Sequence, residues 1–146
     1  MNIASKLDIK GSIVHLGSFK HSNNFRHDRN QSCNYKTNKY IILIKNIKEI
    51  LGSTPKNTLL IIENSGNRKI GQSLEEISHI IKDIDDARVR LCLDTCHLFS
   101  NGYKFENKKE LEEFVEKLSS LQLINKLECL HLNDSRDSFN SGHYRH

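Results

Sequence analysis

The sequence predicts an α/β fold in which parallel strands alternate with helices. Two features predict it: short apolar runs alternate with longer segments of helical periodicity, and four apolar runs carry a histidine or an acid at their ends. Strands that alternate with helices are typical of parallel sheets with right-handed crossovers. The functional loops of such sheets lie at the carboxyl ends of the strands. We therefore expect the four polar end residues to meet on one face.

The first β/α unit begins with a short apolar run, residues 12–16, which carries His15 and is ended by Gly17. Residues 20–38 are polar, rich in Asn and Ser and without clear periodicity, which indicates a long loop or a frayed helix start. Residues 40–51 then carry apolar side chains at helical spacing. This unit places His15 at the carboxyl end of the first predicted strand.

The second unit contains a continuous apolar run, residues 59–62, which is followed at once by Glu63. A short run of this kind is typical of a strand that is buried on both faces. Ser73 and Glu76 then form a capping box, in which each side chain hydrogen-bonds the main chain of the other residue. We expect this box to open a helix that extends to about residue 83.

The third unit carries the most informative run of the chain. Residues 89–93 are predicted to form a buried strand, and Asp94 and His97 follow directly, three positions apart. Asp94 stands at the strand end, and we expect His97 one loop turn beyond it. An acid and an imidazole just past a strand are typical of the way a barrel enzyme presents metal ligands.

A helix and a fourth strand complete the pattern. Asn107 is expected to cap a helix over residues 108–121, whose apolar side chains fall on one stripe. Residues 127–132 form the fourth predicted strand, which carries His131 near its end. Four apolar runs thus end alike, which favours one shared site over four separate coincidences.

The composition limits the class of protein. The 146 residues suit one ordinary domain, and the hydrophobic share of 36% allows a modest core. The formal net charge of +4 permits a polyanionic partner, although a mild and scattered excess also serves solubility. The first residues contain no apolar signal core, and no run is long enough to cross a membrane. We therefore expect an intracellular protein of the nucleus, the cytoplasm or a viral particle, which is not secreted and does not bind a membrane.

The four cysteines are expected to be reduced thiols, since the protein is expected to be intracellular. Cys92 and Cys129 lie inside apolar runs and are interpreted as small core residues. Cys96, next to His97, is either a zinc ligand or a packing residue. We favour packing, because carboxylates and imidazoles already provide a ligand set.

The end residues support metal chemistry. Carboxylates and neutral imidazoles are the ligands that suit Zn²⁺, and also Mn²⁺ or Fe²⁺. A carboxylate can bridge two ions, and neighbouring ions can activate a water and hold the oxygens of a phosphodiester during in-line displacement. The sequence shows no Ser-His-Asp arrangement and no glycine-rich phosphate loop.

Each candidate also has a purely structural interpretation. A histidine near a strand end often serves only as a hydrogen-bonded structural residue. Glu63 and Asp94 could cap the helices that follow them, since acids favour helix N-termini. The segment after His131, which contains Asn133 and Asp134, could be an ordinary turn. These interpretations do not explain why all four runs end alike.

The same residues carry a resemblance to a known family. The matching motifs are Val-His-Leu-Gly-Ser at residues 14–18, Ile-Glu-Asn-Ser at 62–65, Cys-Leu-Asp-Thr-Cys-His at 92–97 with Gly-Tyr at 102–103, and His-Leu-Asn-Asp-Ser at 131–135. Arg145 and His146 are similar to part of a further Asp-Arg-His motif. In the order and spacing of these motifs, the chain resembles the endonuclease IV family of apurinic/apyrimidinic endonucleases.

The resemblance implies a (β/α)₈ TIM-barrel fold that carries up to three zinc ions, with Mn²⁺ as an alternative metal, and that cleaves double-stranded DNA 5′ to abasic sites. It implies that Glu63 is the catalytic residue. It assigns six metal ligands: His15 to the first zinc, Glu63 as a bridge between the first and second, Asp94 and His131 to the second, and His97 and His146 to the third. Tyr144 stands where the family has an aspartate ligand.

The length of the chain bears on this expectation, because a barrel of this type takes about 250 residues. The resemblance covers roughly the middle half of the family's length. We therefore expect residues 1–146 to form a single partial domain, an incomplete barrel of about four β/α units without the N- and C-terminal units. Such a chain is a fragment, a degraded gene product or one part of an assembly in which a partner or the missing segments complete the barrel.

Three functional interpretations stay open from the sequence. The first is a DNA repair endonuclease that cuts 5′ to abasic sites by multi-zinc hydrolysis. The second is a metal-dependent sugar isomerase or epimerase of the same barrel type, against which the combination of motifs speaks. The third is an inactive or truncated homologue that only binds DNA or a partner protein. Tyr144 and the family ligands without a counterpart favour the third interpretation for the isolated chain.

Overall fold

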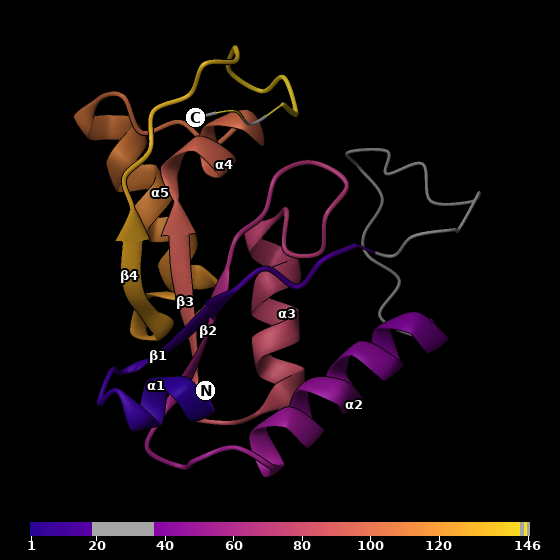
Figure 1. The fold of residues 1–146 in the computed structure, drawn as a ribbon. Helices are drawn as coiled ribbons and strands as arrows, with labels where there is room; N and C mark the ends of the chain where they lie inside the picture. Colours follow the sequence, from indigo (N-terminus) through magenta and orange to yellow (C-terminus); the bar gives the residue numbers. More distant parts are fainter. Residues whose placement is uncertain (19–36, 144, 146) are drawn as a thin grey trace.

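The protein is represented by a computed structural model, which describes residues 1–18, 37–143 and 145 (Figure 1). Its centre is a parallel sheet of four strands in the order β1-β2-β3-β4. The strands are β1 (Gly11–Val14), β2 (Leu59–Glu63), β3 (Val89–Asp94) and β4 (Leu127–His131). The predicted α/β class with parallel strands is confirmed, and all four predicted strands form at the expected places.

The register of the sheet brings the carboxyl ends of the strands together at one end of the sheet. Val14 pairs with Ile62, and Asp94 pairs with His131 at the last position of both strands. All strands run the same way, so their carboxyl ends meet at the end marked by the arrowheads in Figure 1. β1 and β4 are the two edges of the described sheet, and each pairs with only one neighbour.

Helices connect the strands. They are α1 (Asn2–Lys6), α2 (Asn38–Gly52), α3 (Leu74–Ile84), α4 (Thr95–Ser100), α5 (Lys108–Ser120) and the 3₁₀ helix η1 (Ile124–Lys126). Both predicted caps form: the side chain of Ser73 accepts from the main-chain N–H of Glu76 at 3.2 Å, and that of Asn107 accepts from the N–H of Glu110 at 3.0 Å. The reciprocal half of the predicted capping box is wrong, because the Glu76 carboxylate accepts from the N–H of Gly71 at 2.8 Å instead of from Ser73. The predicted loop or helix start at residues 20–38 lies almost entirely outside the described residues.

The hydrophobic core lies between the sheet and the helices. Alternate strand residues point to opposite faces, so Ile62 lies in the core with Leu91 of β3, while Glu63 belongs to the other face. α3 covers this core with the fully buried Ile77 and Ile80. The strands therefore place Ile62 and Leu91 under the helices, and Glu63 on the opposite side of the sheet together with the buried Ile61 and Cys92.

Both predicted helices, α2 and α5, form, and each buries only part of its apolar residues. In α2, the apolar residues Ile41 and Ile50 are 55% and 48% exposed, while Tyr40 and Ile47 are buried. In α5, only Leu118 of the predicted stripe is fully buried. The periodicity located both helices, but the buried face depends on which neighbouring element each helix contacts.

The structure corrects the prediction for the chain after β3. The sequence predicts a loop turn there, whereas residues 95–100 form α4. Asp94 caps this helix, because its Oδ1 accepts from the main-chain N–H of His97 at 3.0 Å. His97 is therefore held on a helical turn.

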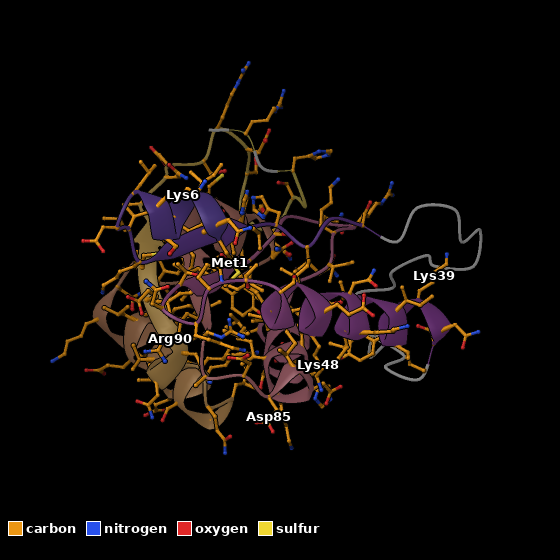
Figure 2. The ribbon with its side chains drawn as sticks, turned by 60° about the horizontal axis from the view of Figure 1, so that its bottom comes forward. Met1, Lys6, Lys39, Lys48, Asp85 and Arg90 are labelled. Atoms are coloured by element: carbon orange, nitrogen blue, oxygen red, sulfur yellow. The ribbon has the colours of Figure 1, made fainter. Side chains whose placement is uncertain are left out.

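The opposite end of the sheet carries a separate charged cluster. Figure 2 turns this end forward, with Met1 and Arg90 labelled. Glu128 forms ion pairs with Lys10 at 2.8 Å and with Arg90 at 3.3 Å, and so links the chain at the start of β1 to β3 and β4.

Among the described residues, no helix is both long and apolar enough to cross a membrane.

Candidate metal centre

The candidate side chains lie at the carboxyl ends of four strands, at the same end of the sheet. Glu63, Asp94 and His131 are the last residues of β2, β3 and β4, and His15 directly follows β1. The sequence predicted these positions from the apolar runs alone. The structure brings all four side chains together at this end of the sheet, in two groups that share Glu63.

Glu63 lies at the centre of this group and is only 7% exposed. Its Oε1 is 3.0 Å from Nδ1 of His131, and its Oε2 is 3.5 Å from Nε2 of His15. Nδ1 of His97 lies 4.0 Å from Oε1. The two carboxylate oxygens of Glu63 therefore face different histidines, which is the arrangement that a bridging carboxylate needs.

The side chains form two overlapping groups of possible ligands. Ligand atoms of His15, Glu63 and His97 lie within 4.8 Å of one another, and so do those of Glu63, Asp94 and His131. Glu63 belongs to both groups. Zinc–nitrogen and zinc–oxygen distances are about 2.0–2.2 Å, so small side-chain rotations bring each group onto one ion. The donor set fits two divalent ions that share Glu63.

Burial makes a cation at this site favourable. Glu63 and Asp94 are both buried, and their charged partners within the described part of the chain are histidines rather than Lys or Arg. A buried carboxylate is costly unless it is paired or coordinates a metal. A divalent ion between these groups would provide the compensating charge.

His97 has a defined orientation. Its Nδ1 lies 2.9 Å from the main-chain oxygen of Asn64, and a carbonyl oxygen only accepts, so Nδ1 carries the proton. With Nδ1 protonated, a metal bound by His97 would be held through Nε2. The structure groups His97 with His15 and Glu63, whereas the resemblance pairs it with His146. His146 and Tyr144 lie outside the described residues.

Sequence reasoning assigned no role to the two asparagines that hold the acid in place. Asn64 is 1% exposed and forms two hydrogen bonds with the main chain of Asp94. Asn133 donates from Nδ2 to Oδ2 of Asp94 at 2.5 Å. Asn133 is fixed by Thr95, whose Oγ1 donates to its oxygen at 2.6 Å and accepts from its N–H at 2.9 Å. The sequence did contain a signal for this role, because each asparagine lies one or two residues after a strand that ends in a candidate ligand.

The structural interpretations of the candidates have mixed outcomes. Asp94 does cap a helix, as one of them proposed, but a carboxylate has further lone pairs for a metal. Glu63 caps nothing, because α3 begins eleven residues later and is capped by Ser73. A tight turn does follow His131, because the N–H of Asn133 donates to the His131 main-chain oxygen at 3.2 Å.

The three cysteines that the structure describes take no part in the candidate ligand groups. Cys92 and Cys96 are fully buried, and burial raises the pKa of both thiols, which keeps them protonated. The packing interpretation of Cys96 therefore fits better than a zinc ligand. Cys129 pairs in register with Cys92 but is only half-buried, because β4 is an edge of the sheet.

Comparisons with known proteins place this arrangement in a family. The whole chain, residues 1–146, matches the family described as Xylose isomerase-like TIM barrel. A probable endonuclease 4 of Buchnera aphidicola is 45% identical over 94 residues, which are 62% of this chain and 34% of the relative. A probable endonuclease 4 of Thermosipho melanesiensis is 32% identical over 149 residues, which cover 100% of this chain and 48% of the relative.

One further relative and two solved structures are similar to the chain. The apurinic-apyrimidinic endonuclease 1 of Plasmodium berghei is 37% identical over 70% of this chain and 21% of its own length. The solved structure of AsfvAP:AG superposes with a TM-score of 0.69 at 21% identity, over 99% of this chain and 44% of that one. The 3-keto-D-glucoside 4-epimerase of E. coli gives 0.57 at 14% identity, over 91% of this chain and 47% of that one. The chain thus spans less than half the length of these proteins.

Proposed function

Because the chain belongs to the xylose isomerase-like TIM barrel family, and within it to the endonuclease IV group, we propose that it forms part of a metal-dependent DNA repair endonuclease. The proposed reaction is hydrolysis of the phosphodiester bond 5′ to an abasic site in double-stranded DNA. The observation that carries the proposal is the position of Glu63, which both groups of possible ligands share. The names of the curated relatives agree with a nuclease.

The proposed chemistry follows from the donor set. Bound divalent ions supply charge that activates a water and that stabilises the oxygens of a phosphodiester in in-line displacement. Glu63 is the proposed catalytic residue, since it would fix the separation of two ions. His15 and His131 approach Glu63 from β1 and β4, on either side of β2 and β3, and define the two ends of the site.

The other residues position these groups. Asp94 would contribute to the second ion while Asn64 and Asn133 hold its main chain and its carboxylate. His97 and His146 are the proposed ligands of a third ion. Preorganised ligands of this kind matter because metal affinity and activity fall when their hydrogen-bond partners are lost. We propose Zn²⁺ as the metal, with Mn²⁺ as the alternative.

Closure of the barrel is part of the proposal. β1 and β4 are open edges of the described sheet, and unpaired edges are avoided in a complete barrel. We propose that residues 1–146 are a single partial barrel domain, and that further strands, from this protein or from a partner, pair with these edges. Those strands would supply the remaining ligands of the metal centre.

The test combines metal content with DNA incision. The purified protein is loaded with Zn²⁺, its metal per chain is measured, and a duplex with one abasic site is compared with an intact duplex. Zinc binding with a cut 5′ to the abasic site, lost after exhaustive chelation, is the expected result. Incision that survives metal removal would contradict the proposal, and so would turnover of a free ketose without any cut. Little metal and no cut would favour an inactive homologue.

A further inference from the structure

A pocket of about 220 Å³ opens directly beside the candidate metal centre. It is lined by His15, Gly17, Ser65, Gly66, Lys69 and His97. Two of these residues, His15 and His97, belong to one candidate ligand group, and their ring centroids are 5.4 Å apart. A molecule in this pocket would therefore touch the side of the metal centre that faces β1.

Lys69 is the one cationic lysine or arginine side chain of this lining. It is partly buried and forms no ion pair or hydrogen bond with the described residues through its ammonium group. The loop that carries it is held at both sides, because Ile70 N–H donates to the Gly17 oxygen at 3.0 Å and Ser65 N–H donates to the Gly71 oxygen at 2.9 Å. These bonds hold the main chain of Lys69 at the pocket that His15 and His97 also line, and within the described part of the chain its ammonium group has no acidic partner.

An ammonium that is partly desolvated and has no acidic partner attracts an anion more strongly than an exposed one does. Serine and glycine line the rest of the pocket, so the wall adds no negative charge. A phosphate oxygen suits this setting, because Lys binds phosphate as a point charge. The nearby carboxylates of Glu63 and Asp94 face the proposed ions instead.

We propose that Lys69 is a positioning residue that binds a phosphate oxygen of the DNA strand in the pocket beside His15 and His97. This inference rests on the proposed function, since it takes the phosphodiester of that reaction as its ligand. Lys69 holds the strand against the metal centre and does not take part in the bond-breaking step. It therefore contributes to binding of the substrate more than to turnover of the bound complex.

Arg68 provides a matched control in the same loop. It carries the same charge one residue earlier, its side chain is exposed, and it does not line the pocket. Loss of either charge weakens non-specific binding to DNA by a similar amount. The free energy of this non-specific binding depends on how many phosphates the protein neutralises. Only the loss of Lys69 removes a contact inside the pocket.

The experiment measures binding of metal-free protein, in chelator, to a duplex with a tetrahydrofuran abasic analogue by fluorescence anisotropy. Lys69→Met and Lys69→Gln are expected to raise the Kd about tenfold, as loss of one hydrogen bond to a charged group does. Arg68→Met should raise the Kd about twofold or less. Lys69→Arg keeps the positive charge and should therefore keep most of the affinity of the wild type. With metal-loaded protein, the same Lys69 variants should raise KM and leave kcat within about twofold.

The outcomes separate this inference from the proposed function. Equal weakening by Lys69→Met and Arg68→Met, in protein whose wild-type form cuts the abasic duplex, would overturn the role of Lys69 alone. A wild-type protein that neither prefers nor cuts the abasic duplex would overturn the proposed function. Thermal unfolding of each variant shows whether it is folded. If one Lys69 variant is unfolded, the other two replacements decide the result.

Discussion

The side-chain amide of Asn64 forms two hydrogen bonds with the main chain of Asp94. Its Oδ1 accepts from the N–H of Asp94 at 2.6 Å, and its Nδ2 donates to the oxygen of Asp94 at 3.2 Å. The main-chain oxygen of Asn64 also contacts His97. One buried residue at the end of β2 therefore fixes the end of β3 and the start of α4, where two candidate ligands lie.

Asn64→Ala is expected to lower the free energy of unfolding by about 2–4 kcal/mol, because it leaves buried main-chain groups of Asp94 without partners. Urea denaturation of the metal-free protein measures this change. Asn57→Ala is the control, since Asn57 is exposed at the opposite end of β2; its effect should stay within about 0.5 kcal/mol. Equal effects of the two changes would refute a special role of Asn64.

Glu63→Ala is expected to abolish any incision, and Glu63→Gln should do the same while it keeps the shape of the side chain. Both changes remove the charge that two ion sites would share, so at least one bound metal per chain should be lost. Metal analysis after gel filtration, beside the incision assay, measures this. Glu112→Gln is the control: it changes an exposed acid on α5 and should alter neither the metal content nor the incision. Normal activity of Glu63→Gln would show that the residue is misassigned.

Asn133→Ala is expected to weaken metal binding about 10–100-fold with little loss of stability, because Asn133 orients the Asp94 carboxylate from a partly exposed segment. Competition with a chromogenic chelator measures the metal affinity. The neighbouring exposed Asp134→Ala is the control and should bind metal like the wild type. An unchanged affinity in Asn133→Ala would mean that Asp94 needs no such support.

Tyr103→Phe tests a pH dependence. Burial raises the pKa of Tyr103 to about 12, and its hydroxyl accepts from the N–H of Leu74 at 3.0 Å. In the unfolded chain a tyrosine has a pKa of about 10. The unfolded chain therefore ionises first, and this group's contribution to stability, complete below pH 10, is lost as the pH rises towards 12.

In Tyr103→Phe this alkaline loss should be absent, so the stability difference between wild type and variant should shrink between pH 10 and pH 12. At neutral pH the variant should be less stable by about 1 kcal/mol, since Leu74 N–H loses its acceptor. Chemical denaturation at several pH values measures both effects. A difference that stays constant over this range would show that Tyr103 ionises alike in the folded and unfolded chain.

The sequence located most of the fold. The four strands were recognised because each is a short apolar run, and the helices α3 and α5 because Ser73 and Asn107 cap them. Helix α4 was missed, since its six residues, which begin with Thr-Cys-His directly after Asp94, show no full period of apolar residues. The apolar pattern does not show which residues of α2 and α5 are buried, because the neighbouring elements decide which part of each helix is covered.

The candidate site divides in the same way. The positions of His15, Glu63, Asp94 and His131 followed from parallel topology, because strands that run the same way bring their carboxyl ends together. The roles of Asn64 and Lys69 did not follow. Asn64 meets a residue thirty positions away, and Lys69 lines a pocket with histidines of two other segments.

The sequence by itself determined the order of strands and helices, the caps and the placement of acids and imidazoles at strand ends. These depend on apolar periodicity and on hydrogen bonds between residues a few positions apart. Only the tertiary structure decided that the two oxygens of Glu63 face different histidines and that Lys69 lines a pocket together with His15 and His97. The register and curvature of the sheet set these distances between side chains that are far apart in the chain, and no local pattern encodes them.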